Sequence, residues 1–255
     1  MGVYPELRDK VAIVTGGNTG IGEAIALALG QQASGVVVVG SRHPAETKRV
    51  VDAINAAGGQ ALDVAADLTR GTEAEAMVRA AVERFGHVEI LVNAVGGFWS
   101  RRLVVETDEA EWDHILAVNL KSVFVCCKAV LPGMLERGWG RIINVSSEAG
   151  RMPVAFTAAH YAASKAGLLG FTRHLAREVA ASGVTVNATA PGTTYSPRVR
   201  GILNPELEDR MIGLTPMGRI ADPADQVGAV LFLASDAATY ITGATIDVSG
   251  GKVML

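Results

Sequence analysis

Residues 10–22 read KVAIVTGGNTGIG, a short run rich in β-branched side chains that ends abruptly in glycines. Such a run at 10–15 is typical of a strand buried on both faces of a parallel sheet. The glycines let the backbone turn tightly, and residues 20–33 then repeat apolar side chains at helical spacing. A helix N-terminus after such a turn presents N–H groups to phosphate, so the stretch predicts a strand–turn–helix unit that binds a dinucleotide. Its spacing, G-x-x-x-G-x-G, also occurs in plain turns.

The rest of the chain alternates strand and helix patterns without a linker or an internal repeat. Further strands are expected over 35–40, 60–66, 89–93, 141–145, 184–190 and 244–248, and helices over 44–57, 72–85, 109–137, 160–181 and 224–234. This alternation predicts one α/β domain over residues 1–255, a three-layer doubly wound fold with a mainly parallel sheet and helices on both faces. Residues 191–216 are rich in Pro, Gly, Ser and Thr, and are interpreted as a substrate loop.

Composition excludes several classes of function. A net charge of −3 gives no electrostatic reason to expect nucleic acid or an anionic membrane. The first residues contain no apolar run, and no stretch reaches the roughly 18 apolar residues of a spanning helix, so we expect a cytoplasmic protein. Cys126 and Cys127 are interpreted as small buried hydrophobes. The five histidines lack partners at ligand spacing, which argues against a metal, and His160 is expected at a surface or an interface.

Residues 161–165, YAASK, place a tyrosine and a lysine at i and i+4 of a predicted helix. The two side chains then lie one turn apart on one face. An ammonium group beside a phenol lowers the tyrosine pKa from about 10, and such a tyrosine can exchange a proton with a hydroxyl or a carbonyl. The same pair also occurs on ordinary helix surfaces.

Taken in order, several motifs along the chain resemble the short-chain dehydrogenase/reductase family, the single-domain Rossmann oxidoreductases. They are TGGNTGIG at 15–22, NAVG at 93–96, Asn119, Ser147, YAASK at 161–165 and PG at 191–192. The resemblance extends over about residues 10–251. It implies a seven-stranded Rossmann sheet, NAD or NADP as cofactor, and hydride transfer between nicotinamide and a carbonyl/alcohol pair.

The resemblance also implies catalytic roles. Tyr161 would be the general acid/base, and Lys165 would bind the nicotinamide ribose and lower the tyrosine pKa. Ser147 would hydrogen-bond the substrate oxygen, with Ser146 as its competitor. Asn119 would hold a water in a proton relay, or would simply bond its own helix backbone. The spacing from Ser147 to Tyr161 is one residue longer than is commonest in the family, so the substrate loop between them is expected to differ in shape.

Cofactor contacts are carried over in the same way. They are Gly16, Asn18, Thr19, Gly20, Ile21, Gly22, Ser41, Arg42, Asp67, Leu68, Asn93, Ala94, Gly96, Tyr161, Lys165, Pro191, Gly192, Thr194 and Ser196. After the second predicted strand, Ser41 and Arg42 stand where a carboxylate would favour NAD, so NADP is favoured over NAD. Thr19, where many NADP-preferring relatives carry a basic residue, argues the other way. Asp67 could equally cap a helix near Thr69.

The favoured function is an oxidoreductase that transfers a hydride between NADP(H) and a carbonyl or secondary alcohol, with Tyr161 as general acid/base. An NAD-dependent alcohol or polyol dehydrogenase, a 3-oxoacyl-thioester reductase, and a catalytically silent nucleotide-sensing protein on the same fold remain alternatives. A sugar-nucleotide epimerase is disfavoured, because few residues follow the last predicted strand. Relatives are commonly homotetramers that associate through the helices bearing Asn119 and Tyr161 and through the last helix and strand. Nucleic acid and membrane partners are not expected.

Overall fold

The centre of the protein is one seven-stranded sheet, seen in a computed structural model that describes residues 3–41, 44–98, 101–154 and 157–254. The strand order is β3-β2-β1-β4-β5-β6-β7, and neighbouring strands pair in parallel. The strands are β1 (Val11–Thr15), β2 (Gly35–Gly40), β3 (Ala61–Ala65), β4 (Ile90–Asn93), β5 (Gly140–Val145), β6 (Val184–Pro191) and β7 (Thr245–Val248). This arrangement confirms the predicted doubly wound Rossmann fold.

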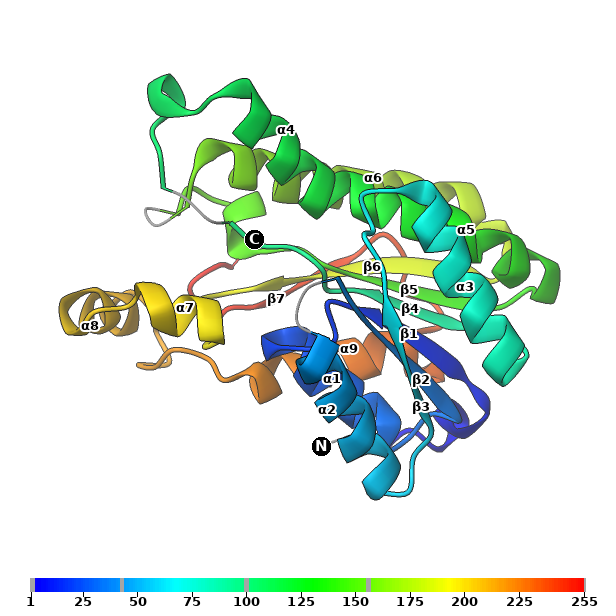
Figure 1. Ribbon diagram of the computed structural model, residues 1–255. Helices are drawn as coiled ribbons and strands as arrows, with labels where there is room; N and C mark the ends of the chain where they lie inside the picture. Colours follow the sequence, from blue (N-terminus) through cyan, green and yellow to red (C-terminus); the bar gives the residue numbers. More distant parts are fainter. Residues whose placement is uncertain (1–2, 42–43, 99–100, 155–156, 255) are drawn as a thin grey trace.

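Helices cover both faces of the sheet, which lies between them as the middle layer (Figure 1). One face carries α3 (Gly71–Phe85), α5 (Ser122–Arg137) and α6 (Ala159–Val179), with α4 (Glu109–Leu116) beyond the carboxyl edge. The other face carries α1 (Gly20–Gly30), α2 (Pro44–Ala56) and α9 (Val227–Ala234). Short 3-10 turns lie at Pro5–Asp9, Val104–Glu106, Glu148–Gly150, Ala180–Ser182, Pro223–Gln226 and Asp236–Ala238.

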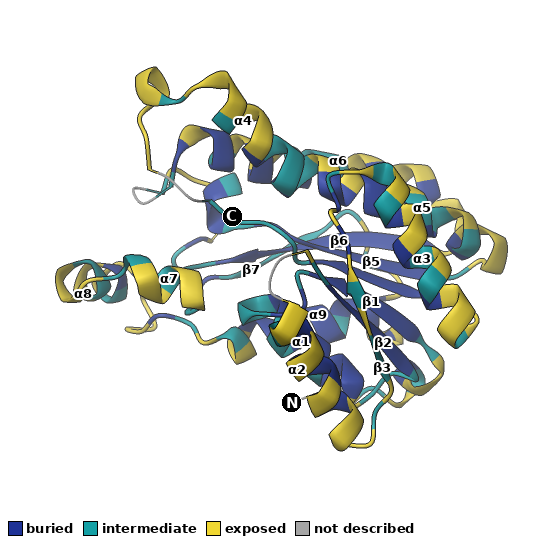
Figure 2. Ribbon diagram, in the orientation of Figure 1, coloured by how far each residue is buried: buried dark blue, intermediate teal, exposed yellow. Residues whose placement is uncertain are grey.

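Two separate cores explain why the central strands β1, β2 and β4 are nearly continuous apolar runs. Successive side chains of a strand point to opposite faces. In β1, Ile13 packs in the core beneath α3, α5 and α6, whereas Ala12 and Val14 pack in the core beneath α1, α2 and α9. Both faces of the central strands are therefore buried, as Figure 2 shows for the sheet and the inward sides of the helices.

The helix expected over 109–137 is interrupted by a π-helical turn. The turn spans Ala117–Lys121 and separates α4 from α5 along a continuous helical path. Inside it, the Asn119 side chain donates a hydrogen bond to the Ile115 carbonyl at 2.9 Å. Such a bond competes with the regular backbone ladder. The break in the predicted helix thus has a local cause, the Asn119 hydrogen bond, which the periodicity of the apolar residues does not reveal.

The same stretch, Glu109–Arg137, is the one segment of the described chain long and apolar enough to cross a membrane. Its α5 part is packed as a core helix. Val123, Cys126, Cys127 and Val130 are buried in the core beneath the sheet. Core helices of this kind meet the same criteria of length and composition, so the segment gives no support for a membrane span.

Two short helices occupy the segment expected to be a loop over 191–216. They are α7 (Pro197–Ile202) and α8 (Pro205–Gly213). Each begins with a side-chain cap followed by proline: Ser196 accepts from the Val199 N–H, and Asn204 accepts from the Leu207 N–H. Cap plus proline is a helix-start signal. Both helices project beyond the carboxyl ends of the strands (Figure 1), and we call them the lid.

Candidate active site

The site begins where the strand order reverses, between β1 and β4. Thr15 and Asn93 are register partners at the carboxyl ends of these strands. Just beyond them, the Ala94 N–H donates to the Thr15 carbonyl at 3.2 Å and the Val95 N–H donates to Thr15 Oγ1 at 3.3 Å. Ligands of doubly wound sheets bind at such a reversal. A cavity of about 890 Å³ lies there, lined by the loops after β1 to β6 and by the lid.

The glycine turn after β1 forms one wall of this cavity. Gly16 has a φ of +64°, and a Cβ there would stand 2.9 Å from the Val95 backbone. A Cβ on Gly22 would stand 2.1 Å from the Gly16 carbonyl oxygen. Side chains are therefore excluded, and the N-terminus of α1 is open to the cavity. The wall suits the close approach of a pyrophosphate.

Most of the predicted cofactor contacts come together in this cavity. Its lining includes Gly16, Asn18, Thr19, Gly20, Ile21, Gly22, Ser41, Asp67, Leu68, Ala94, Gly96, Tyr161, Lys165, Pro191, Gly192, Thr194 and Ser196. Arg42 lies outside the described residues. Asp67 does not cap α3; its Oδ1 accepts hydrogen bonds from the Thr69 N–H and hydroxyl, at 3.0 and 2.8 Å, in the turn after β3.

Asn93 is the exception among the described cofactor contacts. Its side chain is buried in the sheet, where Nδ2 donates to Asn144 Oδ1 at 2.9 Å. Asn144 in turn donates to Thr172 Oγ1 at 2.9 Å, which links β4 and β5 to α6. Because Asn93 does not line the cavity, its side-chain geometry does not support a direct cofactor contact. It supports the sheet beneath the site.

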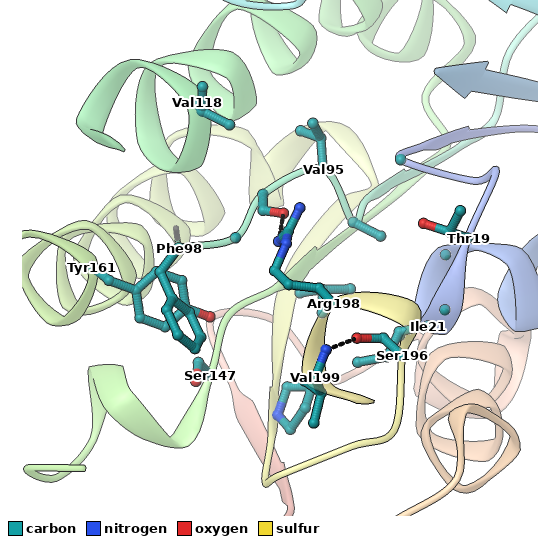
Figure 3. A pocket seen from close by; sticks show the side chains of 18 of the residues that line it. Thr19, Ile21, Val95, Phe98, Val118, Ser147, Tyr161, Ser196, Arg198 and Val199 are labelled. Atoms are coloured by element: carbon teal, nitrogen blue, oxygen red, sulfur yellow. Dashed lines mark hydrogen bonds between the residues drawn. The ribbon is translucent and has the colours of Figure 1, made fainter. Parts of the chain in front are cut away.

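Tyr161 and Ser147 meet at the inner end of the cavity (Figure 3). The Tyr161 hydroxyl lies near the Ser147 side chain, and both residues line the cavity. Ser147 begins the 3-10 turn after β5, where its Oγ accepts from the Ala149 N–H at 3.1 Å. The Phe98 ring lies 5.1 Å from that of Tyr161, centroid to centroid, and gives this end an apolar wall. One substrate oxygen can contact both hydroxyls.

Ser146, the competitor of Ser147, has a structural partner. Its hydroxyl donates to the Lys165 carbonyl at 3.0 Å and joins the end of β5 to α6. The Lys165 ammonium donates to the Val145 carbonyl at 2.9 Å and lies 5.8 Å from the centroid of the Tyr161 ring. These contacts favour Ser147 over Ser146 for the substrate oxygen.

Burial dominates the titration of the Tyr161–Lys165 pair. It raises the pKa of Tyr161 above its usual value, and the Ser147 hydroxyl and the Arg198 charge offset only part of that rise. Burial, assisted by the Arg198 charge, lowers the pKa of Lys165 to about 8. The expected fall of the tyrosine pKa below 10 is not found in this geometry, because the loss of solvent outweighs the favourable interactions with Ser147 and Arg198.

Asn119 is buried and does not line the cavity. Its Oδ1 accepts from the Gly97 N–H at 2.8 Å, and its Nδ2 donates to the Gly97 carbonyl at 2.9 Å as well as to Ile115. Of the two roles expected for Asn119, the hydrogen bond to its own helix backbone is present. The pairing with Gly97 fixes the loop after β4, and a role in a water relay stays a prediction.

Several residues at the site were not found from the sequence. Arg198 of α7 lines the cavity, and so does Glu148, which forms an ion pair with Lys252 at 2.9 Å. Local sequence patterns could not predict the contact of Arg198 with Gly96 or that of Glu148 with Lys252, because the partners are far apart in sequence. His160 is a correction of another kind: it is buried, with Nε2 3.3 Å from a Glu111 carboxylate oxygen, rather than exposed. Among the described residues no cluster could hold a metal ion.

Known proteins resemble the chain over nearly its whole length. The sequence profile of the family described as Enoyl-(Acyl carrier protein) reductase matches residues 16–252. The chain is 41% identical over 248 residues to a 3-oxoacyl-(acyl-carrier-protein) reductase of Staphylococcus epidermidis, covering 96% of this chain and 100% of the relative. A reductase of the same name from Vibrio cholerae is 42% identical over 250 residues, covering 98% and 99%.

Solved structures agree. A 3-oxoacyl-(acyl-carrier protein) reductase from Brucella melitensis superposes with a TM-score of 0.92 at 34% identity, covering 99% of this chain and 94% of the other. A second structure from that organism, with bound NAD, gives a TM-score of 0.89 at 33% identity and the same coverage.

A parallel seven-stranded sheet whose reversal point holds a glycine-walled cavity and a Tyr–Ser pair defines a nicotinamide-dependent oxidoreductase of the Rossmann class. The chain belongs to the short-chain dehydrogenase/reductase family. It is an enzyme that transfers a hydride between a nicotinamide dinucleotide and a carbonyl/alcohol pair, so the alternative of a silent sensing protein is set aside.

Proposed function

We propose that the protein is an NADPH-dependent reductase of 3-oxoacyl thioesters. The observation that carries the reaction type is that the hydroxyl groups of Tyr161 and Ser147 lie together in the wall of the cavity, with Lys165 beside them. The substrate class is supported by the full-length similarity to proteins named 3-oxoacyl-(acyl-carrier-protein) reductase. The proposal thereby narrows the predicted carbonyl reductase to the predicted alternative of a 3-oxoacyl-thioester reductase.

In this proposal, Tyr161 and Ser147 both act on the oxygen of the substrate carbonyl. When bound, the nicotinamide supplies the hydride. Tyr161 donates its phenolic proton to the developing alkoxide, while the Ser147 hydroxyl donates a hydrogen bond to the same oxygen. Lys165, buried beneath Tyr161 and held by the Val145 carbonyl, stabilises the phenolate that remains. Phe98 excludes water from the tyrosine ring.

NADPH rather than NADH is the second element of the proposal. Ser41, at the end of β2, lines the cavity, and neither it nor the residue after it is acidic. An acidic side chain there would bind the free ribose hydroxyls of NAD, whereas Arg42 suits a 2′-phosphate. Arg42→Ala should weaken NADPH more than NADH, and Ser41→Asp should reverse the preference. Equal effects of Arg42→Ala on both cofactors would contradict the choice.

A substrate panel tests the proposal directly. Short 3-oxoacyl thioesters, 2-enoyl thioesters, simple ketones and polyols are assayed with both cofactors by absorbance at the nicotinamide band. We expect the highest kcat/KM with a 3-oxoacyl thioester and NADPH. Turnover confined to the enoyl thioester, where the proton goes to carbon, would contradict the role of Tyr161 and Ser147.

A polyol dehydrogenase is the second candidate, and one observation favours it. Glu148 places a carboxylate in the cavity wall beside Ser147, with Lys252 against it. A charged wall suits a substrate that carries hydroxyl groups better than an aliphatic chain. The polyols of the same panel decide between the two candidates.

Assembly and location complete the proposal. We infer one Rossmann domain with residues 191–216 as its substrate lid, located in the cytoplasm as a homotetramer. Phe124 on α5 is exposed and contacts Phe171 on α6 edge-on, with ring centroids 6.4 Å apart, and this apolar pair on the predicted interface helices supports association there. Sedimentation of Phe124→Asp should give smaller species than wild type; unchanged tetramers would contradict this interface.

A further inference from the structure

One cationic side chain, that of Arg198 on the lid helix α7, extends across the cavity. Arg198 Nη1 donates a hydrogen bond to the Gly96 carbonyl at 3.1 Å, between residues 102 positions apart. Figure 3 shows this side chain between the Tyr161 and Phe98 side of the pocket and the Thr19 and Ile21 side. The guanidinium rests on Gly97, where a Cβ would stand 1.5 Å from Nη1. A side chain at this position would displace the guanidinium.

The start of the same helix touches the glycine turn. A Cβ built on Gly20 would lie 3.2 Å from Cβ of Ser196, the residue that caps α7. Gly20 is the first residue of α1 and has a φ of +58°. Arg198, two residues beyond Ser196, therefore lies within a long side chain's reach of the α1 N-terminus, where phosphate groups bind.

The position of Arg198 matters because the described lining of the cavity contains few cationic side chains. Among the described residues that line the cavity, the lysine and arginine side chains are Lys165 and Arg198. Lys165 is held at the Val145 carbonyl beside Tyr161. The turn at 15–22 has no basic side chain, so no cation of the turn offsets the two negative charges of a pyrophosphate. A guanidinium fork matches phosphate oxygens in two parallel hydrogen bonds.

We propose that Arg198 is a pyrophosphate-binding residue of the lid, which exchanges the Gly96 carbonyl for phosphate oxygens when the dinucleotide binds. This inference rests on the dinucleotide site of the proposed function. In the cofactor-free protein the contact with Gly96 holds α7 against the loop after β4. With the dinucleotide bound, the cofactor itself holds the helix, so binding and lid position are linked.

The test compares Arg198→Gln with Arg200→Gln. Arg200 lies on the same helix but stacks on Tyr195, with its guanidinium carbon 4.1 Å from the ring centroid, and does not line the cavity. Two probes are titrated calorimetrically: NADPH, which contains the pyrophosphate, and adenosine 2′-monophosphate, which does not. We expect Arg198→Gln to raise the Kd of NADPH about tenfold to a hundredfold, the usual effect of losing a charge-assisted bond. Arg198→Lys should recover part of the loss.

The Kd of adenosine 2′-monophosphate should stay unchanged in both variants, and Arg200→Gln should bind both probes as wild type does. An unchanged NADPH affinity in Arg198→Gln would overturn the inference, and so would equal weakening of the two probes. A raised KM for the carbonyl substrate with unchanged NADPH binding would assign Arg198 to the substrate instead. Failure of the wild type to bind NADPH would refute the proposed function itself.

Hydrogen exchange supplies a readout independent of turnover. In the cofactor-free protein, amides of Pro197–Ile202 should exchange faster in Arg198→Gln than in wild type, because the contact with Gly96 is lost. NADPH should slow exchange there in wild type and less in the variant. Equal exchange in both proteins, with and without NADPH, would count against the linkage.

Discussion

Lys252 and Glu148, 104 residues apart in sequence, form a buried ion pair directly behind the candidate catalytic serine. The Lys252 ammonium lies 2.9 Å from a Glu148 carboxylate oxygen, and both side chains are less than a tenth exposed. A second pair, Arg151 with Asp247 of β7 at 2.9 Å, joins the same segment to the last strand. The segment after Ser147 is thus held in place by the C-terminal end of the chain.

Lys252→Met should lower the free energy of unfolding substantially. Removing one partner of a buried pair leaves an uncompensated charge, which costs about 3–5 kcal/mol. Denaturant unfolding measures the change. Lys48→Met is the matched control, because Lys48 and Asp52 form an exposed pair at 2.7 Å, and such pairs contribute about 0–1 kcal/mol. Adding Glu148→Gln to Lys252→Met should recover part of the loss; similar losses for both lysine variants would show that burial of the pair is unimportant.

Tyr161→Phe should remove the proton donor and little else. The ring still packs against Phe98, so we expect kcat to fall about 100- to 10,000-fold with an NADPH Kd close to that of wild type. Steady-state kinetics and a binding titration separate the two effects. Tyr195→Phe is the control, since its hydroxyl donates to Glu208 outside the cavity. Near-normal turnover in Tyr161→Phe would end the case for this residue as acid/base.

Stability should depend on pH through Lys165. Its pKa is about 8 in the folded protein against an ordinary 10.5. Below pH 8 the folded protein carries the full cost of burying the charge. Between these pH values the unfolded chain holds the proton and the folded chain has released it, so stability rises with pH, by at most about 1.4 kcal/mol per unit. Denaturant unfolding of wild type and Lys165→Met from pH 7 to 9 should show a steeper rise in wild type; above pH 9 the two buried thiols, Cys126 and Cys127, oppose it in both proteins.

Two glycine substitutions should have opposite effects. Gly22→Ala forces a Cβ to 2.1 Å from the Gly16 carbonyl, so the glycine turn must shift, and we expect lower stability and loss of NADPH binding. Gly170, inside α6, has nothing within 4 Å of its Cβ position. Gly170→Ala should therefore raise stability by about 0.4–1 kcal/mol. Thermal unfolding with and without NADPH measures both, and equal binding by the two variants would contradict the steric argument.

The centre of the sheet could be predicted because β1, β2 and β4 are buried on both faces, which makes each of them a short continuous apolar run. The alternation of side chains along β4 also predicts to which face of the sheet Asn93 points, and the motif alone does not. Leu91 belongs to the core beneath α5 and α6, and Asn93, two residues on, points to the same side. The Asn93 side chain therefore faces the core rather than the cofactor cavity.

The rest of the site depends on contacts between distant segments. Arg198 reaches Gly96 and Lys252 reaches Glu148 only because the fold brings the lid and the C-terminal end to the carboxyl edge of the sheet. The Tyr161 pKa shows the same limit: spacing reveals the neighbouring lysine, but the amount of solvent removed from the phenol is a property of the packed structure.

The buried cysteines of α5 make the protein convenient for labelling. Cys126 and Cys127 are the chain's two cysteines, and burial raises the pKa of the Cys126 thiol to about 12 and that of Cys127 well above its ordinary value. Thiol reagents attack the accessible thiolate, so neither side chain should compete for a maleimide dye. A single cysteine introduced at the exposed Arg200 of α7 would then carry the dye alone, and its fluorescence would report lid movement in the otherwise native sequence.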